Sequence, residues 1–229
     1  MIEDLAWLGI EWTPPMIIQS QRLALYRAAF ERLLASGYAY ACTCSRRELA
    51  QMVQAPHEDT EETDDEPIYT GKCRPTNNAT PQTLQPGMNY RFRVPDNETI
   101  RFTDANMGNQ VFTTNQDFGD FLIWRRALSN DPTDAGLPSY QLACVVDDAA
   151  MQITEVVRGA DLLKSTARQI LLQRALELPA VSYFHTRLLR DEHGIRLAKR
   201  HDALAIRALR EKGLSPKELL QIAQDTSTA

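Results

Sequence analysis

The sequence predicts an α/β body in which strands alternate with long helices, interrupted by a small inserted β module. Residues 23–34 carry apolar side chains at helical spacing and end at Gly37, as an amphipathic helix does. Three short segments then alternate apolar and polar residues at the spacing of a small antiparallel sheet; they are 90–94, 99–103 and 110–114. These patterns predict the first helix of the body and the strands of the insert.

Two more continuously apolar runs follow, at residues 139–146 and 181–189. Such runs are typical of strands covered on both faces, and a helical pattern at 160–176 separates them. Strands that alternate with long helices favour a parallel sheet. We therefore expect a body made of residues 1–37 and 139–229, and an inserted module made of residues 38–138.

The remaining segments give clear start and stop signals. A helix over residues 2–8 ends at Gly9, a strand is expected at 38–42, and residues 56–85 have the composition of an irregular insertion. Near the end of the chain, Ser215 and Glu218 form a capping box with proline in the first turn. We expect a last helix to begin there.

Composition and charge exclude several classes of protein. No run approaches the ~18 apolar residues that cross a bilayer, and the start carries acid where a signal peptide carries basic charge. We therefore expect a cytosolic protein with no membrane partner. The net charge of -5 is concentrated in the acidic segment Glu58–Glu66, so the remainder carries about +2. Residues 158–212 have a local excess of basic side chains, which permits phosphate binding but also suits a solvated helical face.

The cysteines suggest a metal site. Cys42 and Cys44 stand one residue apart, and Tyr69 precedes Cys73 by four positions after the acidic segment. Zinc accepts four soft ligands in a tetrahedron, and a second pair would close the site. Two buried thiols are the competing interpretation, because tyrosine is an uncommon ligand. Cys144, alone in an apolar run, is interpreted as a small packed hydrophobe.

A second group of residues suggests a ligand site. An acidic pair, Asp147 and Asp148, ends an apolar run, and Arg158 and Gly159 form a turn into the next helix. This layout is that of a crevice at the carboxyl edge of a parallel sheet. Arg158 could hold a carboxylate through two parallel hydrogen bonds, with the Tyr140 hydroxyl beside it. A core tyrosine, a surface arginine and a solvated acidic turn are the alternatives.

A third group is the basic segment Arg196–Asp202, which contains Lys199 and follows a glycine turn. Clustered cations on a loop suit a nucleotide triphosphate, where charge moves toward pyrophosphate in the transition state. A solvent-facing basic loop is the competing interpretation.

Together and in order, these motifs resemble the glutamyl class of class I aminoacyl-tRNA synthetases. The resemblance rests on Tyr-Gln-Leu-Ala from Tyr140, on Val-Val-Asp-Asp to Asp148, and on the run Thr154–Leu163 that contains Arg158. The segment Arg196–Arg200 is similar to the second ATP signature of that family, with alanine where serine is usual. The resemblance covers almost the whole chain apart from the acidic segment and residues 129–135.

Within that family, two features favour the branch that glutamylates queuosine in tRNA(Asp). The zinc site of the family uses C-x-C followed by Y-x-x-x-C, which matches Cys42, Cys44, Tyr69 and Cys73. Only thirty residues follow Lys199, too few for the anticodon-binding domain of a full synthetase. The resemblance thus implies a Rossmann-like catalytic domain with a zinc-containing insert, which acts as a monomer at full length.

The resemblance also assigns roles and partners. It implies that Tyr140 and Arg158 contact glutamate, that Lys199 contacts ATP, and that tRNA receives the activated glutamate. Family members begin with a β-α unit that carries the first ATP motif, and no such motif precedes Met1. We therefore expect the chain as it stands not to form glutamyl-adenylate. A catalytic fragment of a glutamyl-tRNA synthetase and a non-catalytic, zinc-stabilised RNA-binding protein are the alternatives.

Overall fold

The structure is a computed structural model, and it describes residues 2–44, 48, 68–76, 84–85, 87–126, 136–188 and 206–228. These residues form two compact units: residues 18–185 make the larger unit, and residues 1–17 with 186–229 make the smaller one. The acidic segment Glu58–Glu66 and the basic segment with Lys199 lie outside the described residues. The predicted division of the chain into a body and an inserted module stays a prediction.

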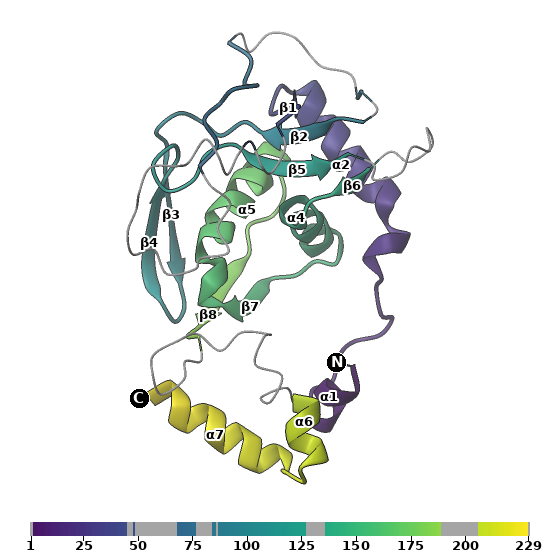
Figure 1. The fold of residues 1–229 in the computed structure, drawn as a ribbon, viewed down its shortest axis with the longest axis vertical. Helices are drawn as coiled ribbons and strands as arrows, with labels where there is room; N and C mark the ends of the chain where they lie inside the picture. The colour runs from purple at the N-terminus through teal and green to yellow at the C-terminus, as the bar shows by residue number, and fades with distance from the viewer. Residues whose placement is uncertain are drawn as a thin grey trace. The chain divides into compact units, whose positions relative to one another are not determined.

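One sheet of the larger unit is wholly antiparallel. Its strand order is β1 (Ala39–Cys42), β2 (Asn89–Phe92), β5 (Phe121–Arg125) and β6 (Leu137–Pro138), and neighbouring strands in it run antiparallel. The second sheet has the order β4 (Gly108–Thr113), β3 (Thr99–Asp104), β8 (Ser182–Thr186) and β7 (Glu155–Gly159). Strands β3 and β4 form an antiparallel hairpin, whereas β3 and β8 pair in parallel (Figure 1).

The sheets differ from the predicted ones in two ways. The segment 90–94 was expected to share a small sheet with the two strands after it, but β2 pairs with β1 and β5 instead. Neither sheet is the parallel one that the sequence predicts: the first is antiparallel, and the second is mixed because β8 returns alongside the β3–β4 hairpin. Periodicity within a segment gives its two faces but not its neighbours, and the pairing partners are far apart in sequence.

The predicted strand over residues 139–146 is wrong, because these residues lie in helix α4 (Tyr140–Ala150). Leu142, Val145 and Val146 are buried and follow the helical spacing of three and four residues. A short apolar run does not distinguish a buried strand from a buried helix by periodicity alone. Asp147 and Asp148 therefore sit inside a helix and not at a strand end.

Helix α4 lies at the centre of the larger unit. It packs against α2 (Leu23–Ala35), against α5 (Leu163–Ala175) and against strand β5 (Figure 1). A short 3-10 turn, η2 (Ala160–Leu162), leads from β7 into α5, so the predicted helix over 160–176 is confirmed. Another 3-10 turn, η1 (Gln19–Gln21), precedes α2.

The core of the larger unit is aromatic. The ring of Phe30 on α2 stacks on Trp124 with centroids 4.8 Å apart and meets Tyr90 edge-on at 4.9 Å. All three side chains are buried. Such pairs add ~0.5–1.5 kcal/mol beyond the burial of their area. The apolar face predicted for α2 is confirmed at Phe30 and its buried neighbours, while Leu23 at the start of the helix is exposed.

The smaller unit contains three helices among its described residues: α1 (Ile2–Trp7), α6 (Ile206–Glu211) and α7 (Pro216–Thr228). Arg210 of α6 forms an ion pair with Asp4 of α1 at 3.1 Å. The capping box is confirmed, because the Ser215 amide donates to the Glu218 carboxylate at 2.8 Å and the Glu218 amide donates to the Ser215 hydroxyl at 3.3 Å. Among the described residues, no helix combines the length and apolar composition that crossing a membrane requires.

Candidate functional site

Arg158, at the end of strand β7, is held by polar partners from three other elements. Its Nη2 donates to the Thr166 hydroxyl on α5 at 2.7 Å, and its Nε donates to His185 Nε2 on β8 at 3.2 Å. Its Nη1 lies 3.4 Å from the Tyr140 hydroxyl at the start of α4. The guanidinium also lies over the Tyr183 ring, 5.7 Å from its centroid. The arginine is therefore fixed in orientation and not a loose surface side chain.

Tyr140 and Arg158 are brought together, as the sequence predicts. Tyr140 is the first residue of α4, and 48% of it is exposed. Asp148, two turns further along the same helix, contributes negative charge near Arg158; burial raises the pKa of this carboxyl, and the positive charge of Arg158 opposes that shift. A partly buried guanidinium beside a half-exposed hydroxyl can bind an anionic group such as a carboxylate. Lys199, the third predicted site residue, lies outside the described residues.

Behind Arg158 lies a buried histidine–carboxylate pair. His185 Nδ1 is 2.6 Å from the Asp104 carboxylate, and neither side chain has exposed surface. Asp104 also accepts hydrogen bonds from the backbone amides of Asn106, Met107 and His185. Burial raises the pKa of Asp104, but the hydrogen bonds from His185 and from these amides outweigh it and lower the pKa to about 2. The group is therefore a carboxylate across the physiological range.

Asp147 ties α4 to the segment before α2. Its carboxylate accepts from the Tyr26 hydroxyl at 2.8 Å and from the Gln19 amide at 2.9 Å, and it pairs with Arg22 at 2.8 Å. The carboxylate is thus neither a solvated turn nor surrounded by acids that could hold a metal. Asp147 thus links α4 to the segment before α2. This corrects the prediction that Asp147 lies at the end of a strand.

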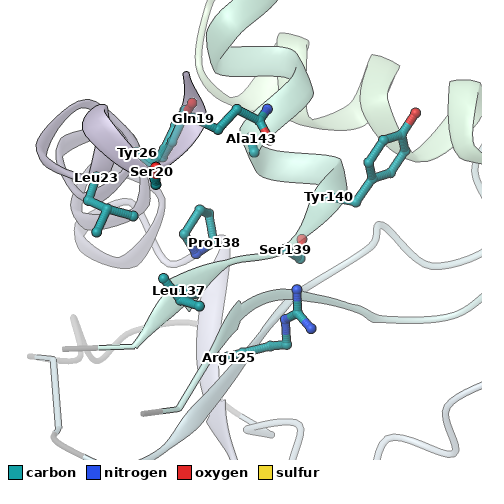
Figure 2. A pocket seen from close by; sticks show the side chains of 10 residues that line it. All are labelled: Gln19, Ser20, Leu23, Tyr26, Arg125, Leu137, Pro138, Ser139, Tyr140 and Ala143. Carbon is teal, nitrogen blue, oxygen red and sulfur yellow. The ribbon is translucent and has the colours of Figure 1, made fainter. Parts of the chain in front are cut away.

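A cavity of 320 Å³ adjoins this tie, between the start of α2, the start of α4 and strand β6. Figure 2 shows the side chains that line it, Tyr140 among them, with the Tyr140 ring pointing away from Leu137 and Pro138. Ser139 lines the cavity, and its buried hydroxyl has no hydrogen-bond partner among the described residues. Arg125 contributes a cation to the same wall.

The cysteines predicted as metal ligands form a cluster. The sulfur atoms of Cys42, Cys44 and Cys73 all lie within 4.8 Å of one another, so this cluster could hold a metal ion. Cys44 and Cys73 are 3.6 Å apart, and the Tyr69 hydroxyl lies 3.6 Å from Cys42 and 3.7 Å from Cys44. Ligands at about 2.3 Å from zinc in a tetrahedron are about 3.8 Å from one another. The spacing of the four side chains therefore fits a tetrahedral ion.

The groups around the cluster shift the ionisation of its side chains in opposite directions. The guanidinium of Arg91, which is 2% exposed, lies 4.3 Å from the centroid of the Tyr69 ring. The amide of Cys73 donates to the Tyr69 hydroxyl oxygen at 2.7 Å. Burial opposes ionisation of the Cys73 thiol, yet hydrogen bonds from Tyr69 and Thr43 lower its pKa. Burial raises the pKa of Cys44 to about 11 and raises that of Tyr69 well above its ordinary value, so the charged form is favoured at Cys73 and disfavoured at Cys44 and Tyr69.

Reasoning from the sequence missed the residues behind Arg158. His185 stands in a segment predicted as a buried strand, where a single histidine is usually a core residue. Asp104 directly follows the predicted strand 99–103, and a carboxylate there is indistinguishable from an ordinary turn residue. No spacing rule connects two residues 81 positions apart. Only the parallel pairing of β3 with β8 brings them together.

The fold resembles that of glutamate-activating tRNA ligases. A glutamate tRNA ligase from Elizabethkingia meningosepticum, solved in complex with its amino acid, superposes with a TM-score of 0.64 at 25% identity, over 89% of this chain and 42% of that chain. A glutamate-tRNA synthetase from Elizabethkingia anophelis superposes with a TM-score of 0.65 at 25% identity over the same shares. These matches show that the chain has the fold of part of a glutamate tRNA ligase.

The sequence matches the family described as tRNA synthetases class I (E and Q), catalytic domain, over residues 1–224, and the chain belongs to this family of aminoacyl-tRNA synthetase-like ligases. It is 37% identical to a glutamyl-Q tRNA(Asp) synthetase of Rhodobacter capsulatus, over 97% of this chain and 80% of the relative. It is 42% identical to a glutamyl-Q tRNA(Asp) synthetase of Geobacter sulfurreducens, over 92% and 62%. A glutamate–tRNA ligase of Aquifex aeolicus is 38% identical, over 96% and 44%.

Replacing the buried carboxylate gives a stability test with a defined pH dependence. The pKa of Asp104 is depressed in the folded state from an unfolded value of about 3.9. Its contribution is therefore present above about pH 4 and is lost as the pH falls through about 2. Asp104→Asn is expected to lower the free energy of unfolding by about 2–3 kcal/mol at pH 7, and by much less near about pH 2.5. Urea titrations at both pH values measure this.

The exposed carboxylate Asp96, which pairs with Arg74 at 3.0 Å, is the control. Asp96→Asn is expected to change the free energy of unfolding by less than about 1 kcal/mol at either pH. An equal loss for Asp104→Asn at the two pH values would contradict the electrostatic account of the Asp104 site.

Proposed function

We propose that this chain is the catalytic part of a ligase that activates glutamate with ATP and transfers it to queuosine in the anticodon loop of tRNA(Asp). The observation that supports this best is the pairing of Arg158 with Tyr140 at an exposed edge, backed by buried residues that fix the arginine. Relatives named glutamyl-Q tRNA(Asp) synthetase favour queuosine as the acceptor.

The proposed chemistry needs no side-chain nucleophile. One glutamate carboxylate is held by Arg158 and Tyr140, while an oxygen of the other attacks the α-phosphorus of ATP and displaces pyrophosphate. Lys199 stabilises the charge that develops on the leaving group. A hydroxyl of queuosine then attacks the acyl carbon, the ester forms, and AMP leaves with the bonding electron pair. Positioning and electrostatics carry both displacements.

We also propose that the cysteine cluster is a structural zinc site with Cys42, Cys44, Tyr69 and Cys73 as ligands. Four protein ligands leave no open position for a water, so the ion stabilises the fold and takes no part in the reaction. Three thiolates and a phenolate carry more negative charge than Zn²⁺ neutralises. The nearby guanidinium of Arg91 offsets part of the remainder. In this view residues 38–138 are an inserted module and residues 1–37 with 139–229 are the catalytic body.

Two other functions remain candidates. The glutamate–tRNA ligase of Aquifex aeolicus, 38% identical over 96% of this chain, favours a catalytic fragment that charges the 3′ end of a tRNA. A zinc-stabilised protein that binds RNA without activating glutamate is the non-enzymatic alternative. The position of the transferred glutamate on the tRNA separates the first alternative from our proposal, and glutamate binding separates the second.

Glutamate binding and transfer together test the proposed function. Calorimetry on the chain as it stands is expected to show glutamate binding at least about tenfold tighter than glutamine, because glutamine lacks the charge that Arg158 recognises. Transfer is measured with a chain extended upstream along the genomic reading frame by about 60 residues, about two β-α steps. Radiolabelled glutamate is expected in the anticodon fragment of queuosine-containing tRNA(Asp) after nuclease cleavage. Label at the 3′ end would favour a glutamyl-tRNA synthetase, and absent glutamate binding would favour the RNA-binding alternative.

The geometry of Arg158 predicts unequal effects of two substitutions. Arg158→Ala is expected to weaken glutamate binding by about tenfold or more, the loss of a hydrogen bond between charged groups. Arg158→Lys keeps the charge but not the planar fork, so its loss is expected to be smaller but still measurable. The dissociation constant for glutamate, measured by calorimetry, reports both. Identical affinities in the two variants and the unmodified chain would remove Arg158 from the glutamate site.

Elemental analysis tests the zinc proposal. The purified chain is expected to carry about one zinc ion, and the double variant Cys42→Ser/Cys73→Ser is expected to carry none, because two of four ligands are lost. Cys144→Ser is the matched control, since this cysteine lies in α4 outside the cluster, and it is expected to retain the full amount. Unchanged zinc in the double variant, or none in the unmodified chain, would rule the site out.

A further inference from the structure

The orientation of Arg158 depends on a hydrogen bond that His185 accepts at Nε2. Four donors surround the Asp104 carboxylate: three backbone amides and His185 Nδ1, which is 2.6 Å away. A carboxylate can only accept, so the hydrogen of the imidazole lies on Nδ1. Nε2 then presents its lone pair to the other side of the ring.

The other side of the ring faces Arg158 and Thr166. The Thr166 hydroxyl oxygen lies 3.1 Å from His185 Nε2 and can either donate to it or accept from it. Arg158 Nε lies 3.2 Å from His185 Nε2, and a guanidinium has no acceptor. A hydrogen on Nε2 would therefore point at the Nε–H of Arg158. The neutral imidazole with its hydrogen on Nδ1 donates to Asp104 and accepts from Arg158. The Thr166 hydroxyl fits this form, because it can turn its hydrogen toward Nε2 or toward the Leu162 carbonyl. The carboxylate of Asp104 selects this form.

Two contacts on one edge fix the plane of the guanidinium. His185 accepts from Nε, and the Thr166 hydroxyl accepts from Nη2 at 2.7 Å and donates to the Leu162 carbonyl. Recognition of a carboxylate by two parallel hydrogen bonds requires the fork to lie in a defined plane. A guanidinium that rotated about its last bonds would keep its charge but lose that geometry.

We propose that Asp104 and His185 are positioning residues for Arg158. The Asp104 carboxylate selects the imidazole form with its hydrogen on Nδ1. In that form, Nε2 of His185 holds the Arg158 Nε–H in the plane needed to bind glutamate. The proposal rests on the proposed role of Arg158 in glutamate binding. Neither residue touches the ligand.

The position of Asp104 at the end of β3 links the β3–β4 hairpin to Arg158. Asp104 ends strand β3, which pairs with β8 in parallel opposite Tyr183, and the Asn106 side chain donates to the His185 carbonyl at 2.8 Å. The β3–β4 hairpin therefore reaches the glutamate-binding residue through one buried pair. A displacement of the hairpin would change the orientation of Arg158 without any change in the residues that contact glutamate.

Nuclear magnetic resonance of the side chains tests the proposal without substrate. In the unmodified chain, the His185 ring is expected to carry its hydrogen on Nδ1 and none on Nε2 at pH 7. The Nε–H signal of Arg158, assigned by its loss in Arg158→Lys, is expected to exchange slowly with water because it is hydrogen-bonded. A His185 ring protonated on Nε2 would overturn the proposal.

Two substitutions of His185 separate positioning from general stability. In His185→Gln, the side chain can place an acceptor where Nε2 lies, whereas the shorter side chain of His185→Asn reaches only the position of Nδ1. In His185→Asn we expect the Arg158 Nε–H to exchange about tenfold faster and glutamate to bind about tenfold more weakly. In His185→Gln we expect both values to stay within about threefold of the unmodified chain. Both variants lose the histidine, so a purely structural role predicts equal effects.

The outcomes distinguish failure of this proposal from failure of the proposed function. If Arg158→Ala leaves glutamate binding unchanged, the proposed function fails, and the exchange rates still decide whether His185 orients Arg158. If Arg158→Ala weakens binding but the two His185 variants match each other in exchange and in affinity, the positioning role is overturned. Thermal unfolding of each variant checks that it is folded.

Discussion

A carboxylate that folding removes from water must be surrounded by donors, and this requirement holds the larger unit together. Three buried carboxylates among the described residues each join segments far apart in sequence. Asp147 joins α4 to the start of α2, Asp104 joins β3 to β8, and Asp120 accepts from the Tyr40 hydroxyl at 2.5 Å and the Val94 amide at 2.8 Å. Breaking one partner would leave a buried charge, so each junction specifies the packing around it.

The same requirement gives the candidate site its rigidity. Arg158 is held by a hydroxyl and an imidazole, and the imidazole is in turn held by Asp104. A binding arginine on a strand end would otherwise sample several rotamers, and fixing them before a ligand arrives reduces the entropy lost on binding. The sulfur atoms of Cys42, Cys44 and Cys73 bring the end of β1 together with a segment that follows later in the chain, and Tyr40 and Tyr69 are buried in the same cluster.

The part of the site that the sequence predicted consists of residues whose chemistry is distinctive by itself. Three cysteines and a tyrosine with ligand spacing, and an arginine before a glycine turn, stand out in any context, and the structure groups the thiols and pairs Arg158 with Tyr140. His185 and Asp104 could not be found in this way. A histidine in an apolar strand and an aspartate at a turn are common, and their meaning comes only from their contact.

The sequence by itself determined most helix and strand positions, the capping box at Ser215, the cysteine cluster and the membership in a family of tRNA ligases, because these depend on local periodicity, residue chemistry and motif order. The tertiary structure decided the state of residues 139–146, the partners of β2 and the tie from Asp147 to Tyr26. It also decided the pairing of β3 with β8 that places Asp104 behind Arg158. The physical reason is that a buried helix and a buried strand have similar composition, and that strand pairing and buried polar contacts are set by neighbours distant in the chain.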